Sequence, residues 1–439
     1  MSARCRETRA RRGRARWTAA AALALAGAAL AAWLAWSGWT PPWSAGVRTK
    51  WDLWAGGVTR LRGANIWQGR NYGGRYALVG RHAIGPRYVQ EDFDAMAAAG
   101  ANYVNLSHPG IFSEDPPYQP DPVIVENLDR LLEMIEAADM FAVIGFRTGP
   151  GRNEFTFARD GAGRWFTQDE LNEAVWSDRA VQDAWGEMWR DAAARYRTNP
   201  IVVGYDLMVE PNGNAVAPDR GGSWMPEGFF RDYAGTLYDW NEMYPRLVAA
   251  VRALDPDTPI LVGGVGWSGL TWLPYLRRID SRHLVYLFHH YEPHGTYTHQ
   301  PPPARQAYPG TFDVNGDGLP EIVDATWLDG RFAMADNLGA PVAVNEFGAH
   351  RWAPGVARFL RDSMELIERR GWNHAVWMWH AAAHPPDRDA FNYLHGSDPD
   401  WHADIPDNGI MAVIRANWAR NSVRPSTAPF SRGGRGARR

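Results

Sequence analysis

The chain has almost no cysteine: its 439 residues include only Cys5, which lies in an arginine-rich start. The remainder can therefore form no internal disulfide and has no thiol for nucleophilic attack or for binding a metal ion. A cysteine protease, a cysteine-ligated zinc module and a disulfide-stabilised scaffold are excluded on this ground.

The signatures of several other enzyme classes are also missing. No Gly-x-Gly-x-x-Gly turn follows the first apolar segment, which disfavours an open dinucleotide-binding sheet. No His-Glu-x-x-His sequence occurs and no Ser-His-Asp arrangement stands out, so a metal-dependent hydrolase is a weak alternative. The formal net charge is only −3 and gives no reason to expect a nucleic-acid partner.

One long apolar run is present near the start of the chain. Residues 17–36 read WTAAAALALAGAALAAWLAW, without a charge, and seven arginines precede them. This length suits a membrane-spanning helix, and the preceding positive charge keeps the N-terminus cytoplasmic. We expect 1–16 to be a basic cytoplasmic leader, 17–39 a signal anchor or cleaved signal peptide, and 40–57 a linker. A buried soluble helix is the alternative. The rest is then exported to the periplasm or outside the cell, held at the inner membrane if the segment is retained.

After the leader, eight short apolar segments alternate with helical patterns. The segments are almost continuously apolar, as expected of strands buried on both faces. Strand–helix alternation predicts a parallel sheet, and eight such units predict an α/β fold, a closed (β/α)₈ TIM barrel over 58–425. The Gly- and Arg-rich tail, 426–439, is expected to be disordered. The predicted strands are 58–66, 101–107, 140–146, 201–208, 259–265, 283–290, 341–347 and 375–380.

Polar and aromatic residues stand at or just past the C-terminal ends of these segments. In a TIM barrel that end carries the active site, built on the long loops that follow the strands. The chain also has 23 tryptophans, of which some are expected to fill the core and others to line a saccharide cleft. The strand-end residues are Asn105, Arg147, Glu210, His289, Glu346 and Trp379.

Two of these residues are carboxylates that follow apolar strands. Glu210 comes after the fourth segment in GYDLMVEP, and Glu346 ends the seventh in PVAVNEFG. One such residue alone would be explained as a surface or structural carboxylate. Strands four and seven lie across a barrel from each other, so both side chains can converge over its opening. A protonated and an ionised carboxyl group in one cleft favour cleavage of a glycosidic bond.

Several motifs together resemble glycoside hydrolase family 5. RGANI is similar to that family's first-strand motif, VEP matches its Asn-Glu-Pro in two of three positions, and VNEFG resembles its nucleophile strand. LFHHY fits its sixth-strand His-x-Tyr, and VWMWH resembles its eighth-strand aromatic. The resemblance covers about residues 58 to 420 and rests on the order and spacing of the motifs.

The resemblance implies a role for each matching residue. Glu210 would be the acid/base and Glu346 the nucleophile of a retaining hydrolase that cleaves a β-linked glucan, mannan or related glycoside by double displacement. Tyr291 would donate a hydrogen bond that helps to hold the nucleophile ionised, and His289 would orient the leaving-group side. Trp379 would form the floor of the subsite under the sugar that is attacked, with core packing as the alternative.

Two positions depart from the family pattern. Val209 stands where the family has an Asn that binds the sugar 2-hydroxyl, and Asn105 stands where it has an Arg. Arg147 could replace the missing positive charge, and His108 could supply further polar contacts. The departures leave two alternatives open: a transglycosylase, and a catalytically weak or inactive carbohydrate-binding envelope protein. In each case the expected partner is an oligo- or polysaccharide, the protein is expected to be a monomer, and catalysis needs no cofactor.

A possible structural calcium loop lies after the sixth strand. Residues 313–324, DVNGDGLPEIVD, place oxygen-bearing side chains at loop positions one, three, five, nine and twelve, with Gly318 at position six. This spacing is typical of Ca²⁺ loops, although the twelfth residue is usually Glu. A Gly-rich acidic surface turn is the alternative. The predicted ligands are Asp313, Asn315, Asp317, Glu321 and Asp324.

Overall fold

The computed structural model describes five stretches of the chain: 46–72, 83–164, 166–218, 225–382 and 389–432. The apolar segment predicted to be a signal anchor lies outside these residues, so the structure does not test it. Within the five stretches, no helix has the length and apolar character needed to cross a membrane.

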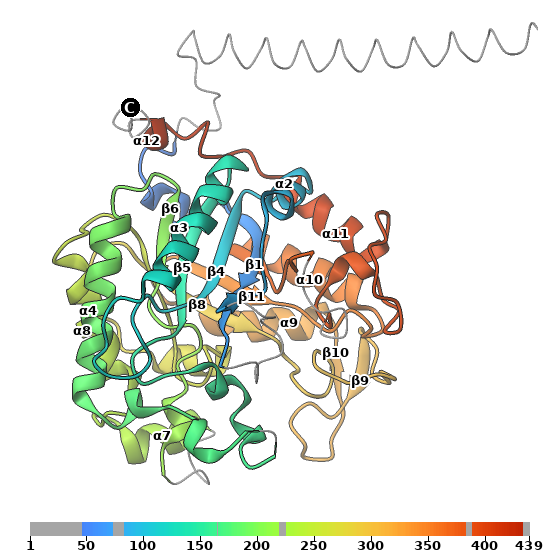
Figure 1. The fold of residues 1–439 in the computed structure, drawn as a ribbon. Coiled ribbons are helices and arrows are strands. Elements are labelled where there is room, and N and C mark those ends of the chain that lie inside the picture. The colour runs from blue at the N-terminus through green and yellow to red at the C-terminus, as the bar shows by residue number, and fades with distance from the viewer. Residues whose placement is uncertain (1–45, 73–82, 165, 219–224, 383–388, 433–439) are drawn as a thin grey trace, which may run out of the picture. The chain divides into compact units, whose positions relative to one another are not determined.

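Eight parallel strands close into a barrel, which confirms the predicted (β/α)₈ fold (Figure 1). The sheet closes where β1 pairs with both β4 and β12. Every residue of the eight strands is buried, since side chains from the interior and from the surrounding helices cover both faces. The strands are β1 (Arg62–Trp67), β4 (Tyr103–Pro109), β5 (Phe141–Thr148), β6 (Val202–Asp206), β7 (Ile260–Gly263), β8 (Leu284–His290), β11 (Val342–Phe347) and β12 (Asn373–Val376).

Amphipathic helices surround the strands (Figure 1). Most begin at a side chain that accepts hydrogen bonds from first-turn N–H groups, as Asp121, Asp178 and Asp239 do for α3, α4 and α8. The connection from β7 to β8 has only a short 3₁₀ helix, Leu270–Tyr275. The longer helices are α2 (Gln90–Ala98), α3 (Pro122–Ala137), α4 (Arg179–Tyr196), α7 (Pro226–Tyr233), α8 (Trp240–Arg252), α9 (Ala325–Phe332), α10 (Val356–Arg369) and α11 (Gly409–Trp418).

Both ends of the folded unit pack against the end of the barrel where the strands begin, opposite the mouth. Two predicted boundaries differ from this arrangement. Leu53 and Trp54, placed in a linker by the sequence, are buried against the lower barrel interior, where the indole of Trp54 donates to the carbonyl of Val203 at 2.9 Å. Phe430, placed in the tail, stacks on Phe141 with ring centroids 6.0 Å apart. The predicted linker 40–57 and tail 426–439 therefore include residues that belong to the folded unit. A few isolated apolar residues that cover the end of a barrel show no periodicity in the sequence, so their burial could not be predicted.

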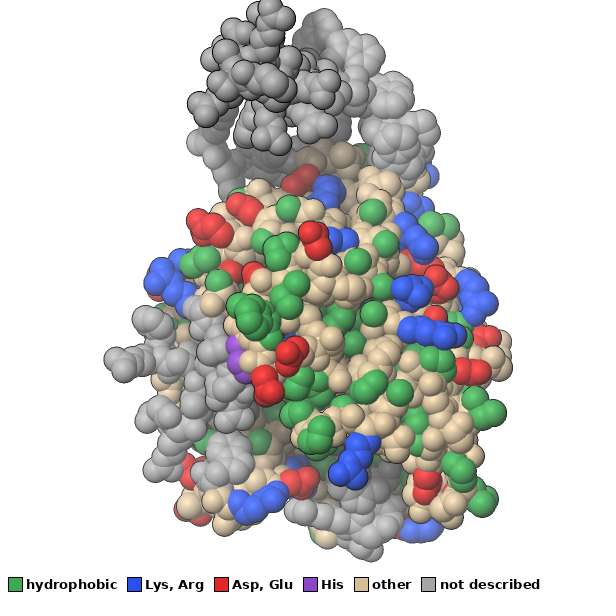
Figure 2. Space-filling view, turned by 90° about the vertical axis from the view of Figure 1, so that its right-hand side faces the viewer, with side chains coloured by type: hydrophobic (Ala, Val, Ile, Leu, Met, Phe, Trp, Pro, Cys, Tyr) green, Lys and Arg blue, Asp and Glu red, His purple; other side chains and the backbone are tan. Residues whose placement is uncertain are grey.

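Charged side chains of both signs are interspersed on the face shown in Figure 2, and neither sign forms one continuous patch there. Exposed ion pairs also form within helix α4, between Arg179 and Asp183 and between Arg195 and Asp191. Exposed pairs of this kind contribute little to stability, so the fold depends mainly on its buried core.

Candidate active site

Glu210 and Glu346 converge at the C-terminal mouth of the barrel. Glu346 lies in β11, and Glu210 lies four residues beyond the end of β6. His289, on β8, bridges them: its Nδ1 is 2.9 Å from Glu210 Oε1 and 3.3 Å from Glu346 Oε2. One carboxylate oxygen of each glutamate lies within 4.8 Å of the other. Two acidic groups from distant parts of the chain therefore share one small polar site.

The backbone at Glu210 is held in an uncommon conformation. Its φ is +56°, in the left-handed region that non-glycine residues rarely adopt. The fully buried guanidinium of Arg152 donates to the carbonyls of Arg147, Val209 and Glu210 at 2.6–2.8 Å. These charge-assisted bonds offset the local strain, so Arg152 fixes the direction in which the Glu210 side chain projects.

The surroundings of Glu346 raise its pKa above the usual range of a glutamate. Burial raises the pKa of Glu346, the charge of His289 opposes that rise, and the charge of Glu210 adds to it. Tyr291 donates to Glu346 Oε2 at 3.1 Å and lowers the same pKa. Burial and the charge of Glu210 thus favour the protonated form of Glu346, whereas His289, Arg147 and Tyr291 favour its ionised form.

The acidic groups around His289 favour its positively charged form. Burial opposes its charge, but the charges of Glu346, Glu210 and Asp206 and the hydrogen bond to Glu210 raise the pKa of His289 to about 9. A positive imidazolium between two carboxylates reduces the repulsion that would otherwise separate them. The residue thereby permits the close approach of the two glutamates.

A match to a known family adds to this geometry. The model of the cellulase family, glycosyl hydrolase family 5, matches residues 66–383, which is more than half of the chain. The chain belongs to glycoside hydrolase family 5. The resemblance read from the motifs is thereby confirmed.

Individual family 5 relatives are distant. An endoglucanase C of Acetivibrio thermocellus is 24% identical over 237 residues, covering 53% of this chain and 59% of the relative. An endoglucanase of Paenibacillus polymyxa is 30% identical over 192 residues, 40% of this chain and 41% of the relative. The chain therefore spans less than two thirds of the length of these relatives. Cel5A of Thermotoga maritima, solved with mannotriose, superposes with a TM-score of 0.54 at 18% identity, covering 80% of this chain and 96% of Cel5A.

Arg147 lies at the C-terminal end of β5, next to the last residue of the strand. It projects from the end of β5, where it donates to Glu154 Oε2 at 2.9 Å and to Ser107 Oγ at 3.1 Å, and its guanidinium stacks on Phe157 at 3.8 Å. Its charge lowers the pKa of Glu346. Arg147 therefore supplies positive charge near one member of the carboxylate pair.

Two other predicted site residues do not reach the mouth. Asn105 lies in the middle of β4, not at its end, and donates to Asn65 Oδ1 at 2.7 Å inside the barrel. His108 faces outward, with Nε2 2.9 Å from Asn127 Oδ1 on α3, and is fully buried. The strand predicted over 101–107 ends two residues before β4 does. Because a shift of one residue along a strand reverses the face to which a side chain points, this error changed the expected direction of both side chains.

Trp379, predicted to be the aromatic residue under the sugar, also lies in a different place than expected. Strand β12 ends at Val376, four residues before its predicted end. Trp379 is 6% exposed and packs on the fully buried Trp418 of α11, with ring centroids 6.3 Å apart, so its place is in the core. Trp377 is partly exposed and packs with the aromatic cluster that includes Trp67, whose ring lies 5.7 Å from the guanidinium of Arg147. Trp377 is therefore better placed than Trp379 to contact a ligand at the mouth.

Val209 is buried beneath the site and does not face it. Its backbone N–H donates to the carbonyl of Phe146 at 2.9 Å, and its side chain packs so closely on Gly145 that a Cβ there would lie 3.0 Å from Val209 Cγ2. The side chain is 1% exposed. In this family 5 member, a polar contact to substrate from position 209 is therefore absent.

A buried polar layer that was not predicted from the sequence lies below the carboxylate pair. Asn345 Nδ2 donates to Asp206 Oδ2 at 3.0 Å, and Asn65 Nδ2 donates to the carbonyl of Asn345 at 2.7 Å. Asp206 is 1% exposed. An acidic residue within the otherwise apolar strand VVGYD was the signal that could have revealed this layer, because an unpaired buried carboxylate is costly.

The predicted calcium loop forms a turn next to the hairpin of β9 (Gly310–Phe312) and β10 (Glu321–Val323). Asp313 accepts from the N–H groups of Gly316 and Gly318, and Glu321 accepts from Val314. Asp324 points elsewhere: its Oδ1 accepts from the first turn of α9 at 2.8 and 3.0 Å. Calcium binding remains a prediction, in which Asp324 would serve as a helix cap and not as a ligand.

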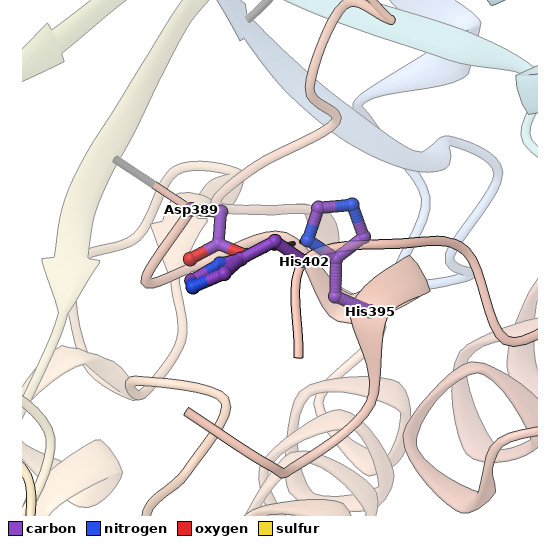
Figure 3. A group of neighbouring side chains, drawn as sticks. All are labelled: Asp389, His395 and His402. Carbon is purple, nitrogen blue, oxygen red and sulfur yellow. Dashed lines mark hydrogen bonds and ion pairs between the residues drawn. The ribbon is translucent and has the colours of Figure 1, made fainter. Parts of the chain in front are cut away.

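A second group of histidines and a carboxylate lies in the segment after β12 (Figure 3). Asp389 Oδ2 accepts from His395 Nδ1 at 2.5 Å, His402 Nδ1 at 3.0 Å and the buried Arg351 at 2.9 Å. Asn392 Nδ2 lies 3.0 Å from His395 Nε2, so that nitrogen accepts and Nδ1 carries the proton. A protonated Nδ1 and an adjacent guanidinium are unfavourable for a cation, and the group instead ties this segment to Arg351.

Proposed function

We propose that the protein is a retaining β-glycosidase that acts by double displacement through Glu210 and Glu346. The observation that supports this most directly is the separation of the two carboxylates, whose oxygens come within 4.8 Å of each other. Retaining glycosidases keep their carboxyl groups about 5–5.5 Å apart, whereas inverting enzymes leave roughly 6.5–9.5 Å for a water molecule. The pair therefore suits direct attack by one carboxylate on the anomeric carbon.

In the first step Glu346 attacks the anomeric carbon and forms a glycosyl ester. The bond to the leaving oxygen breaks, and Glu210 gives that oxygen its proton. In the second step Glu210 takes a proton from water, whose oxygen attacks the anomeric carbon and releases Glu346. The hydrogen bond from Tyr291 and the charge of Arg147 stabilise ionised Glu346 before attack.

The substrate class that best suits the site is a β-linked glucan or mannan. The matching relatives are endoglucanases, and a similar barrel was solved with mannotriose. Trp377 and Phe391 are partly exposed aromatic residues of the cluster beside the mouth, where the apolar face of a pyranose can stack. A binding-only role is not favoured, because binding alone gives no reason to hold two carboxylates against each other.

A mechanism-based 2-fluoro-β-glycoside tests this function. The expected result is a covalent adduct on Glu346 found by peptide mass spectrometry, together with turnover of at least one member of a panel of β-glucans and β-mannans. Glycan binding without an adduct or turnover would overturn the proposal. A product with a new glycosidic bond instead of a free reducing end would identify a transglycosylase.

We also propose, on the sequence alone, that the apolar segment 17–36 directs export of the barrel across the cell membrane. Cell fractionation with detection of the barrel domain tests this directly. Recovery of the full-length chain in the cytoplasm would contradict it, and recovery of a shortened chain outside the membrane would identify a cleaved signal.

A further inference from the structure

Asp206 is the third carboxylate near the site, and the proposed reaction does not use it. It ends β6, four residues before Glu210, and its side chain is 1% exposed. Asn345 of β11 donates to its Oδ2 at 3.0 Å. Strands β6 and β11 are not neighbours in the sheet, so this bond crosses the barrel interior. The carboxylate of Asp206 therefore lies inside the barrel, below the mouth.

The charge that acts most strongly on Asp206 is that of His289. Burial raises the pKa of Asp206 to about 6, while the charge of His289 and the hydrogen bond from Asn345 lower it. In turn, Asp206 is one of three carboxylates that raise the pKa of His289, with Glu346 and Glu210. The charged groups around the imidazole are thus two carboxylates on the Nδ1 side and Asp206 in the interior.

The remaining polar atoms of these two residues are complementary. His289 Nε2 and Asp206 Oδ1 are both buried, and neither has a hydrogen-bond partner among the described residues. Buried polar atoms almost always have a partner, and an imidazolium N–H is a donor where a carboxylate oxygen is an acceptor.

We propose that Asp206 is a positioning residue of the active site, whose buried carboxylate holds His289 as the cation that bridges Glu210 and Glu346. Asn345 orients Asp206, and Asn345 directly precedes Glu346 in β11, so the same strand carries the nucleophile and the residue that fixes the interior charge. Loss of the negative charge of Asp206 lowers the pKa of His289, because burial opposes the imidazolium and only Glu346 and Glu210 then oppose burial. The cation between the two glutamates is then lost at a lower pH.

This inference rests on the proposed function for its catalytic meaning, but its test does not require turnover. The imidazole of His289 is titrated by NMR in the whole protein with labelled histidine, and its signal is assigned by its loss in His289→Gln. In the unmodified protein His289 is expected to be positively charged at pH 7. A neutral imidazole at that pH would overturn the proposal without the need for any variant.

The decisive variant is Asp206→Asn, which removes the charge and keeps an acceptor for Asn345. We expect the midpoint of the His289 titration to fall by about one pH unit or more. Asp255→Asn is the matched control, because Asp255 is also a buried carboxylate, 2% exposed, but contacts Tyr205 and Thr258 instead of the site. It should lower stability and leave the titration of His289 unchanged.

Activity provides a second measurement. If the protein hydrolyses a β-glycan, activity should fall at high pH where His289 loses its charge. This basic limb of the kcat/KM profile should therefore move to lower pH in Asp206→Asn and stay in place in Asp255→Asn. An unchanged His289 titration in a folded Asp206→Asn protein would overturn the role of Asp206 alone. Absence of turnover with a normal titration shift would instead overturn the proposed function and leave the inference intact.

Discussion

The hydroxyl of Tyr291 donates a hydrogen bond to Oε2 of Glu346 at 3.1 Å. Tyr291 directly follows β8, the strand that carries His289. The bond stabilises the ionised form of the carboxylate that is proposed to attack the substrate. A nucleophile in a buried site depends on such donors, because burial by itself favours its protonated form.

Replacement Tyr291→Phe should therefore raise the pKa of Glu346. The nucleophile must be ionised, so the acidic limb of the kcat/KM profile should move to higher pH. The lost bond to a charged group is worth about 1.5–3 kcal/mol, which corresponds to roughly 10–100-fold in kcat/KM. Tyr297→Phe is the control, since that hydroxyl donates only to the carbonyl of Pro354. A Tyr291→Phe profile that keeps its acidic limb would argue against this role.

The two glutamates should differ in their dependence on the leaving group. Glu346→Ala is expected to abolish turnover of all substrates. Glu210→Ala should affect substrates with poor leaving groups most, because a good leaving group departs without a proton. Steady-state rates on aryl glycosides of graded leaving-group acidity provide the measurement. Equal, mild losses in both variants would contradict the assigned roles.

Restoration of the usual family residue at position 209 should be harmful. Val209→Asn places an amide in an apolar site that is 1% exposed and offers no space beside Gly145. An unsatisfied buried amide costs about 1–3 kcal/mol, which thermal or urea unfolding would detect. Val58→Asn, at a position that is 56% exposed, should leave stability almost unchanged. A stable Val209→Asn protein with higher activity would show that this side chain can turn toward the substrate.

Replacement of the two tryptophans after β12 should have different effects on stability and on substrate binding. Trp379→Ala should lower the free energy of unfolding by about 3–5 kcal/mol, because it leaves a cavity against Trp418. Trp377→Ala should cost less stability and raise KM for polysaccharide substrates, since its ring is partly exposed beside the mouth. Denaturant unfolding and kinetics on both variants compare them directly. The reverse pattern would restore Trp379 as the substrate contact.

Added Ca²⁺ should raise the melting temperature of the protein, and chelation should reverse the change. Asp313→Ala should abolish this response because Asp313 is the first predicted ligand. Asp324→Ala should lose roughly 1 kcal/mol of stability as a helix cap but keep the calcium response, since its carboxylate is turned to α9. A melting temperature that ignores both calcium and chelator would refute the site.

Local sequence patterns were sufficient for the barrel, whose strands are continuous apolar runs with helices between them. They also identified Glu210 and Glu346, because each acidic residue interrupts or follows such a run at the end that forms the mouth. The strand ends were less reliable. The predicted ends of two strands were wrong by a few residues, so Asn105, His108 and Trp379 were expected at the mouth. In the structure Asn105 lies in the barrel interior, His108 on the outer face and Trp379 in the core.

The amino-acid sequence by itself determined the fold class, the family and the pair of acidic residues, since these depend on periodicity and on motif order along the chain. Only the tertiary structure decided that His289 lies between the two glutamates, that Asp206 faces the barrel interior and that Trp377 is partly exposed while Trp379 is buried. These relationships join strands that are distant in sequence. They depend on barrel closure and on the face to which each strand residue points, and no local pattern encodes either.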